Sequence, residues 1–233
     1  MHHQPVTTQW IDLGNGFGAH LALPPAGHGP GLLLFQEIFG VNAHIRAVAA
    51  QYAMDGFVVL APDVFWRQAP RIELGYVGDE RARGVALAQA LQPAELLADI
   101  GTAVAALRAR PEVGGRKVGT LGYCLGGRLA WLAAASTDVD AAVPFYGGGI
   151  HTMLDRAASV RCPLQFHYAE HDDHIPLTAV EQVRQAVAGH AAEVHVYPGA
   201  MHGFNCWARA SYHAPSAALA HGRATTFLAQ QLF

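Results

Sequence analysis

The sequence predicts an α/β fold in which a mostly parallel, eight-stranded sheet carries helices on both faces. Three observations lead to this prediction: apolar runs of strand length alternate with helical patterns, most of these runs are apolar throughout, and the chain begins with a hairpin signal. Strands that are apolar throughout are typical of a parallel sheet buried on both sides. We expect a single domain over residues 1–233, because no linker, repeat or low-complexity segment interrupts the alternation.

The elements follow in order along the chain. "TQWIDL" and "GAHLALP" flank "GNG", which indicates an antiparallel pair of strands. Six further strands are predicted by the runs "GLLLFQE", "FVVLAPDVF", "KVGTLGY", "AAVPFYGG", "CPLQFHYAE" and "EVHVYP". Helical patterns cover residues 44–54, 79–91, 93–110, 125–135, 177–188 and 215–231. In such sheets ligands bind beyond the carboxyl ends of the strands, so the residues that follow each strand are the candidates for a site.

Composition narrows the function classes. A net charge of -3, from 15 basic and 18 acidic side chains, offers no basic face for nucleic acid or for a membrane surface. The N-terminus lacks a signal-peptide pattern, and no run approaches the roughly 18 apolar residues of a membrane-spanning helix, so we expect a cytoplasmic protein. Three cysteines without CxxC spacing, and histidines without an HExxH motif, argue against a disulfide framework and a metal site.

The segment "GYCLG" places Cys124 between a predicted strand and a predicted helix. Glycine, any residue, nucleophile, any residue, glycine is the pattern of a nucleophile elbow, a sharp turn that exposes the reactive side chain. Gly122 and Gly126 would let strand and helix approach closely, and the helix beginning at Leu125 would favour a thiolate at its N-terminus. The alternative is a buried structural cysteine in a glycine-rich turn.

A nucleophile needs a base, and the base needs an orienting acid. In this type of sheet the expected chain order is nucleophile, acid, base, each after a strand. Asp172 follows the strand "PLQFHYA", and His202 follows "VHVYP", so both lie where that order requires them. Asp173 is an adjacent alternative for the acid, and one of the two aspartates is expected to cap a turn.

Negative charge develops on the carbonyl oxygen during nucleophilic attack, so N–H donors must face it. One expected donor is the N–H of Leu125, which follows the nucleophile, and the other is the N–H of Ile38 in the loop "FQEIFGVN". Glu37 precedes Ile38 at the end of an apolar strand, and it either faces solvent or points towards the same crevice. A carboxylate beside the thiol would oppose thiolate formation and could accept the thiol proton.

The motifs "QEIFGVN", "GYCLGG", "HDDHIP" and "HGF", in this order, resemble those of the dienelactone hydrolase family of α/β-hydrolase-fold enzymes, the carboxymethylenebutenolidases. The resemblance spans the chain from about Gln9 to its end. It implies a catalytic triad of Cys124, Asp172 and His202, with Glu37 as the partner of the thiol. It also implies that Arg81, in "GDERARG", helps to hold a substrate carboxylate.

One departure from the family concerns the substrate. Family members that cleave dienelactone carry a second arginine shortly after "H-x-F", whereas Cys206 stands there in "HGFNCWARA". Arg209 could substitute from further along, or the substrate could be less charged. Cys206 has neither an elbow nor a base, so we assign it no role. Four aromatic residues are expected to wall the pocket or to belong to the core: Phe39, Tyr146, Phe204 and Trp207.

These residues predict a cysteine hydrolase that forms a thioester and then hydrolyses it, with no metal or organic cofactor required. A thiolate leaves a tetrahedral adduct more readily than an alkoxide or an amide nitrogen does. We therefore expect small activated esters or lactones as substrates, some bearing a carboxylate, rather than peptides. The alternative is a non-catalytic binding protein of the same fold in which Cys124 is a redox-sensitive thiol.

Overall fold

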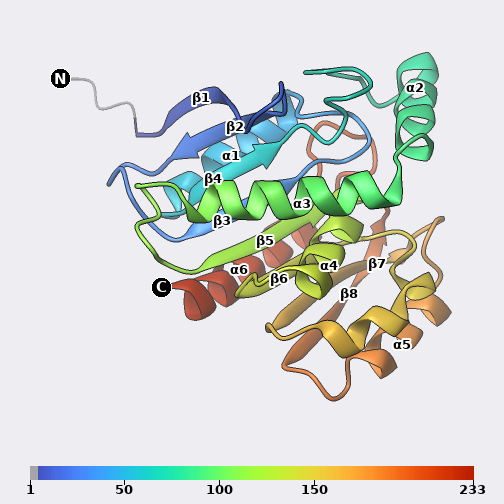
Figure 1. The fold of residues 1–233 in the computed structure, drawn as a ribbon. Coiled ribbons are helices and arrows are strands. Elements are labelled where there is room, and N and C mark those ends of the chain that lie inside the picture. The colour runs from blue at the N-terminus through green and yellow to red at the C-terminus, as the bar shows by residue number, and fades with distance from the viewer. Residues whose placement is uncertain (1–4) are drawn as a thin grey trace.

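The computed structural model describes residues 5–233, which contain an eight-stranded sheet with the strand order β1-β2-β4-β3-β5-β6-β7-β8 (Figure 1). β1 pairs antiparallel with β2, and β2 pairs antiparallel with β4, whereas β4, β3, β5, β6, β7 and β8 run parallel. All eight predicted strands are confirmed: β1 (Thr7–Asp12), β2 (Gly18–Leu23), β3 (Gly31–Phe35), β4 (Val58–Pro62), β5 (Val118–Tyr123), β6 (Ala141–Phe145), β7 (Leu164–His171) and β8 (Ala192–Met201).

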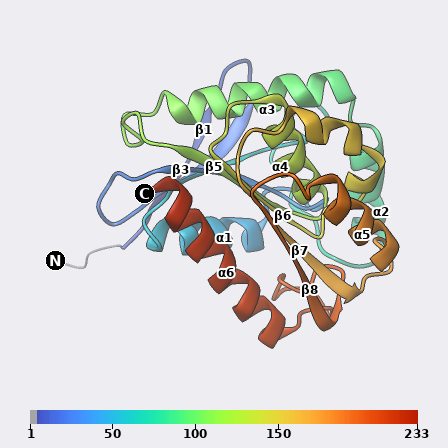
Figure 2. The ribbon, with the colours of Figure 1, turned by 90° about the horizontal axis from the view of Figure 1, so that it is seen from below.

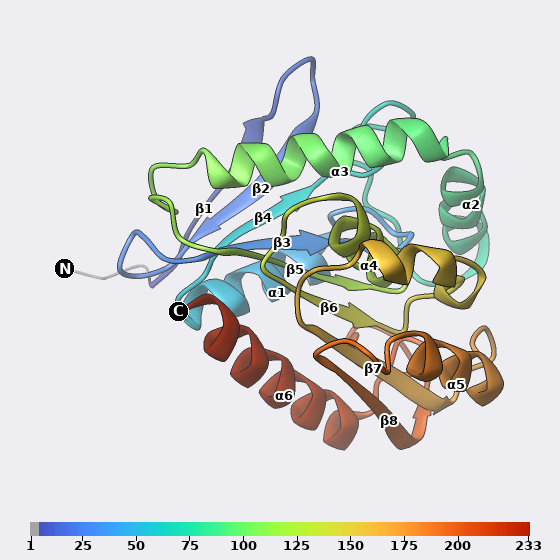
Figure 3. The same ribbon diagram turned by 60° about the horizontal axis from the view of Figure 1, so that its bottom comes forward.

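The six predicted α-helices are present as well, with ends that differ by one or two residues from expectation. They are α1 (Ala43–Met54), α2 (Gly78–Gln89), α3 (Pro93–Arg108), α4 (Leu125–Ser136), α5 (Leu177–Ala186) and α6 (Ala214–Leu232). α1 and α6 cover one face of the sheet and α3 and α4 the other (Figures 2 and 3). The sequence analysis missed two 3-10 helices, η1 (Ile150–Thr152) and η2 (Leu154–Ser159), because such short turns carry no helical periodicity.

Burial in the sheet follows the apolar runs. Every residue of β3, β4, β5 and β6 is buried, as a sheet covered on both faces requires. The β1–β2 hairpin turns through Gly14, Asn15 and Gly16, whose φ angles are +115°, +57° and +83°. Glycine and asparagine tolerate this left-handed region better than other residues, so "GNG" is the local cause of the turn.

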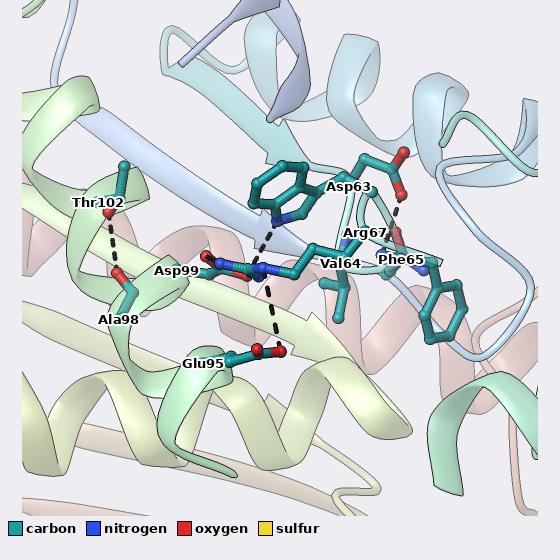
Figure 4. Close-up of polar contacts among 10 residues, drawn as sticks. Asp63, Val64, Phe65, Arg67, Glu95, Ala98, Asp99 and Thr102 are labelled. Carbon is teal, nitrogen blue, oxygen red and sulfur yellow. Dashed lines mark hydrogen bonds and ion pairs between the residues drawn. The ribbon is translucent and has the colours of Figure 1, made fainter. Parts of the chain in front are cut away.

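The segment after β4 ties the sheet to α3 (Figure 4). Nη2 of Arg67 donates to Oδ1 of Asp99 on α3 over 2.9 Å, and the indole Nε1 of Trp66 donates to Oδ2 of the same carboxylate over 3.0 Å. Asp63 turns the segment locally, since its Oδ1 accepts the N–H of Phe65 over 3.1 Å. These contacts fix α3 against the end of β4.

Across the described part of the chain, no helix has both the length and the apolar character that crossing a bilayer demands.

Candidate active site

Cys124 lies at the turn between β5 and α4 and has a strained backbone, with φ of +55° and ψ of -113°. A non-glycine residue rarely adopts such angles, and this strain is a property of nucleophile elbows. The N–H of Cys124 donates to the carbonyl oxygen of Phe145 at the end of β6 over 3.1 Å, which anchors the turn. The residue remains partly exposed, unlike Cys162 and Cys206, which are buried.

The glycines around Cys124 are required by close backbone contacts. A Cβ atom on Gly122 would lie 2.1 Å from the carbonyl oxygen of Gly126, and one on Gly126 would lie 2.2 Å from that of Phe35. A Cβ atom on Gly127 would lie 2.3 Å from the carbonyl oxygen of Phe145. The glycines thus let α4 start directly against the ends of β3, β5 and β6, which leaves the thiol at the carboxyl edge of the sheet.

Asp172 and His202 meet because of the register of β7 and β8. The last paired residues of these parallel strands are His171 and Met201, so the next residue of each strand leaves the sheet at the same level. Nδ1 of His202 lies 2.8 Å from Oδ2 of Asp172. The other oxygen of this carboxylate, Oδ1, accepts the N–H groups of His174 and Ile175 over 2.8 and 3.0 Å. Asp173, the alternative acid, is instead exposed beside the ring of His174.

The environment of His202 favours its protonated form. Burial lowers the pKa of this imidazole, but the negative charge of the Cys124 thiolate, together with the hydrogen bond and charge of Asp172, raises the pKa to about 10. Since Nδ1 is held by Asp172, Nε2 is the atom that can exchange a proton with a reacting group. Nε2 is buried and has no hydrogen-bond partner within residues 5–233, which marks a position where a reacting group would complete the site.

The expected oxyanion donors are both backbone N–H groups free of internal partners. Within residues 5–233, neither the N–H of Ile38 nor that of Leu125 donates a hydrogen bond. Leu125 is the first residue of α4, where the N–H groups have no intrahelical acceptor. Gln36 holds the loop of Ile38 in place, because its Nε2 donates to the Glu37 carbonyl over 3.3 Å and its Oε1 accepts the N–H of Val64 over 3.2 Å.

Glu37 is buried rather than facing solvent, with 1% of its surface exposed. Its Oε1 accepts a hydrogen bond from Nη1 of Arg209 over 2.9 Å. The structure thus brings an arginine to Glu37 from three positions beyond Cys206, and Gly203 makes room for it: a Cβ atom there would lie 2.4 Å from Nη1 of Arg209. No hydrogen bond joins Glu37 to Cys124 in the described chain, so the pairing of Glu37 with the thiol stays a prediction.

The negative charge of Glu37 contributes to the raised pKa values of neighbouring side chains. Burial raises the pKa of the Cys206 thiol to about 12, and the Glu37 charge adds to the effect. Burial also lifts the pKa of Tyr146 well above its usual range, again with a contribution from Glu37. Because Cys206 is buried and strongly disfavours ionisation, it is unsuited to nucleophilic chemistry.

The four aromatic residues singled out from the sequence differ in their positions. The ring of Tyr146 packs edge-on against His202, with centroids 5.1 Å apart, and Phe204 packs against Tyr146 at 5.4 Å. The guanidinium carbon of Arg209 lies 5.7 Å from the centroid of the Phe39 ring. Trp207 is 45% exposed and contacts His44 on α1. Tyr146 and Phe39 therefore border the site, Phe204 lies behind Tyr146 in the core, and Trp207 lies at the surface.

Arg81 lies on α2 with an exposed side chain that forms no hydrogen bond or ion pair within residues 5–233. α2 packs close to the candidate site, because a Cβ atom on Gly84 would lie 2.5 Å from the carbonyl oxygen of Ile38. Arg83, which the sequence analysis did not single out, is also exposed on this helix, and its side chain forms no hydrogen bond or ion pair in the described part of the chain. The family resemblance points to Arg81 of the two, whereas the exposure of both side chains makes each a candidate for binding an anion.

The fold and the elbow are those of the α/β-hydrolase type. Residues 17–232 match the model of the dienelactone hydrolase family, and the chain belongs to this family. It is 37% identical to the carboxymethylenebutenolidase of Pseudomonas putida over 219 residues, which cover 93% of this chain and 92% of that protein. It is 38% identical to the carboxymethylenebutenolidase of Pseudomonas sp. (strain P51) over 186 residues, or 79% of this chain and 78% of the relative.

A crystal structure from Klebsiella pneumoniae subsp. pneumoniae MGH 78578, provisionally described as a dienelactone hydrolase, superposes with a TM-score of 0.85. The two chains are 32% identical, and the match covers 97% of this chain and 99% of the other. Sequence and structure therefore agree on an enzyme that hydrolyses ester or lactone bonds.

Proposed function

We propose that this protein is a cysteine-dependent hydrolase of activated esters or lactones, and that Cys124, His202 and Asp172 form its catalytic triad. The observation that carries the proposal is the geometry of His202: its Nδ1 lies 2.8 Å from an oxygen of the buried Asp172 carboxylate, and its Nε2 is buried without a hydrogen-bond partner among residues 5–233. The charge of Cys124 also raises the pKa of this imidazole. A base that is oriented on one side and free on the other is the arrangement that activates a nucleophile.

The first half of the reaction is acylation. The thiol of Cys124 transfers its proton to Nε2 of His202. Sγ then attacks the carbonyl carbon of the substrate. The N–H groups of Ile38 and Leu125 stabilise the negative charge on the carbonyl oxygen. Collapse of the adduct forms the thioester and breaks the bond to the leaving oxygen, which takes the proton from His202. In a lactone the leaving enol stays attached to the acyl chain, because the ring opens.

The second half is deacylation. Neutral His202 accepts a proton from water, and the resulting hydroxide attacks the thioester carbonyl. The carboxylic acid product leaves, and Sγ of Cys124 takes back the negative charge beside protonated His202. Asp172 holds the imidazole in one orientation and stabilises its cationic form in both halves. A thiolate is expelled from a tetrahedral adduct in preference to an alkoxide, so productive substrates are those with enol or similarly stable leaving groups.

A substrate carboxylate would compete with Glu37 for Arg209. The carboxylate of Glu37 holds Nη1 of Arg209, and an incoming carboxylate offers the guanidinium the same kind of partner. Release of Glu37 would free it to accept the thiol proton in place of His202, as the family resemblance implies. Arg81 on α2 would provide a second cation for the substrate carboxylate. The Pseudomonas putida relative is a carboxymethylenebutenolidase, a name that denotes a hydrolase of a lactone with a carboxylate. This name supports a carboxylate-bearing lactone as the substrate class.

The test is the initial rate of hydrolysis of a dienelactone that carries its free carboxylate, measured for the wild type and for Cys124→Ala. The proposal expects turnover by the wild type and its loss in Cys124→Ala. A wild type that is folded and inactive on this lactone and on uncharged activated esters would instead favour a binding protein.

The three free cysteines of the described chain suit a reducing compartment, and we place the protein in the cytoplasm.

A further inference from the structure

A cavity of about 490 Å³ opens beside the candidate active site. Its lining comes from α2, α3, α4 and η2, which meet at one corner of the molecule (Figure 3). Most of the walls are apolar, including Ile38, Leu91, Leu96, Leu97, Leu132 and Met153. Sites for small molecules typically measure about 300–1,000 Å³ and combine apolar walls with a few polar groups. The size and lining of this cavity are those of a ligand site.

Two residues that line the cavity belong to the segments on either side of the candidate nucleophile and oxyanion donors. Ile38 lines it, and the N–H of Ile38 is a proposed oxyanion donor. Arg128 lines it as well, and its N–H donates to the carbonyl oxygen of Cys124 over 3.2 Å, which places it one helical turn after the nucleophile. The cavity therefore lies against the loop of Ile38 and the first turn of α4, the two segments that carry the proposed oxyanion donors and Cys124.

Two arginines at this cavity have no acidic partner. Arg128 on α4 and Arg156 on η2 both line it, and both side chains are only partly exposed. Neither guanidinium has a carboxylate within 4.0 Å among residues 5–233, although eight ion pairs of Arg with acidic residues occur elsewhere in this part of the chain. Arg209, in contrast, is paired with Glu37. The positive charge at the cavity is thus available to a ligand.

We propose that this cavity binds an extended arm of the substrate, an apolar chain that ends in a carboxylate, with Arg128 and Arg156 holding the carboxylate. The inference rests on the proposed hydrolase function and specifies its substrate further. An apolar chain alone would use the walls and leave two cations unpaired, and a short dianion would leave the walls unused. An apolar chain with an anionic end would contact the apolar walls and also pair with the two arginines, because guanidinium groups bind carboxylates through paired N–H donors.

The first experiment compares two activated substrates of equal length: the 4-nitrophenyl monoester of suberic acid, which ends in a carboxylate, and its methyl ester, which does not. The kcat/KM ratio of the two is measured for the wild type, Arg128→Gln, Arg156→Gln and the double variant. Arg161→Gln is the matched control, because Arg161 is exposed, lies outside the cavity and donates to the carbonyl oxygens of Ala158 and Val160.

The wild type is expected to prefer the carboxylate-bearing ester by about tenfold or more in kcat/KM, chiefly through a lower KM. The preference should fall in each single variant and disappear in the double variant, while Arg161→Gln keeps it. Equal kcat/KM values for the two esters in the wild type would overturn the proposal. A preference that survives in the double variant would overturn it as well.

A binding measurement separates this inference from the proposed function. Octanoate is titrated calorimetrically into Cys124→Ala protein and into the same protein carrying Arg128→Gln and Arg156→Gln, with octanamide as the uncharged control. Octanoate should bind the first protein at least about tenfold more tightly than the second, and octanamide should bind both alike. If neither the two esters nor the dienelactone is hydrolysed but this difference is found, the hydrolase proposal fails and the anion site stands. If octanoate binds both proteins equally, the anion site is overturned whatever the enzyme does.

Discussion

His202 and Asp172 are joined by a 2.8 Å contact between Nδ1 and Oδ2, and they leave adjacent parallel strands at the same level. The side chains are 6% and 1% exposed. Two backbone N–H groups bind the remaining oxygen of the carboxylate, which fixes its orientation. The imidazole is therefore held in a single position, with Nε2 as the only ring nitrogen left for chemistry.

Replacing Asp172 should be far more damaging than replacing its neighbour. Asp172→Asn removes the negative charge that stabilises protonated His202 and changes the preferred tautomer, so kcat should fall by about 10³-fold or more. Asp173→Asn should stay within about twofold of the wild type, since Asp173 is exposed and its one ion pair among residues 5–233 is with the exposed His174. Steady-state rates on an activated ester measure both. Similar losses in the two variants would contradict the assignment.

The reactivity of Cys124 should depend on pH through the protonation of His202. Protonated His202 stabilises the Cys124 thiolate, and its pKa is raised from 6.5 to about 10, so this stabilisation is present at neutral pH and is lost as the pH rises through 10. Iodoacetamide should therefore modify the wild type about tenfold or more faster than His202→Gln at pH 7, and the two rates should converge above pH 10. A rate ratio that stays constant from pH 7 to above pH 10 would argue against the coupling.

The same alkylation should be selective for one cysteine. Burial raises the pKa of Cys162 to about 11 and that of Cys206 to about 12. Neither thiol is ionised appreciably at pH 8, and both are buried. Peptide mapping after brief alkylation at pH 8 should find the label on Cys124. Label on Cys206 in the folded protein would contradict its burial in the structure.

Glu37 and Arg209 should be coupled in stability. Arg209→Met leaves the Glu37 carboxylate buried without its cation, which should cost about 3–5 kcal/mol of the free energy of unfolding. Adding Glu37→Gln removes the unpaired charge, so the double variant should be more stable than the sum of the two single changes predicts, by about 1–3 kcal/mol. Urea denaturation of the four proteins measures this coupling. Additive effects would mean that the two side chains do not interact in solution.

The elbow glycines should tolerate no side chain. Gly126→Ala places a Cβ atom 2.2 Å from the carbonyl oxygen of Phe35, so backbone must move and stability should fall by about 2 kcal/mol or more. Gly101 is the matched control, because it lies within α3 and a Cβ atom there meets nothing within 4 Å. Gly101→Ala should raise stability by about 0.5–1 kcal/mol. Thermal or urea unfolding would test both, and a neutral Gly126→Ala would contradict the close packing.

Most of the fold and the centre of the site could be predicted from local sequence patterns. The position of Cys124 was predictable because the flanking glycines specify a backbone turn, and a turn is encoded locally. Asp172 and His202 were predictable because each directly follows a strand, and neighbouring parallel strands end together. The choice of Asp172 over Asp173 came from the family resemblance alone, because the residues by themselves do not reveal which carboxylate the turn directs inward. The contact to His202 is a property of the folded loop.

Other features depend on irregular segments or on several elements at once. The pairing of Arg209 with Glu37 could not be predicted, because residues 203–213 form successive turns without periodicity. The cavity lined by Arg128 and Arg156 combines helices from four parts of the chain, and one of them is the 3-10 helix that the sequence analysis missed. Such sites arise from tertiary packing and leave no motif in the sequence.

The most direct test of the central claim is to trap the covalent intermediate on Cys124. A dienelactone is mixed with the enzyme, the reaction is quenched in acid within the first turnover, and the intact mass and the peptide carrying Cys124 are measured. We expect the mass of that peptide to increase by the whole mass of the lactone, because ring opening keeps the enol attached to the thioester, and we expect no adduct in Cys124→Ala. Turnover that continues in Cys124→Ala, or an adduct on another residue, would contradict the cysteine mechanism.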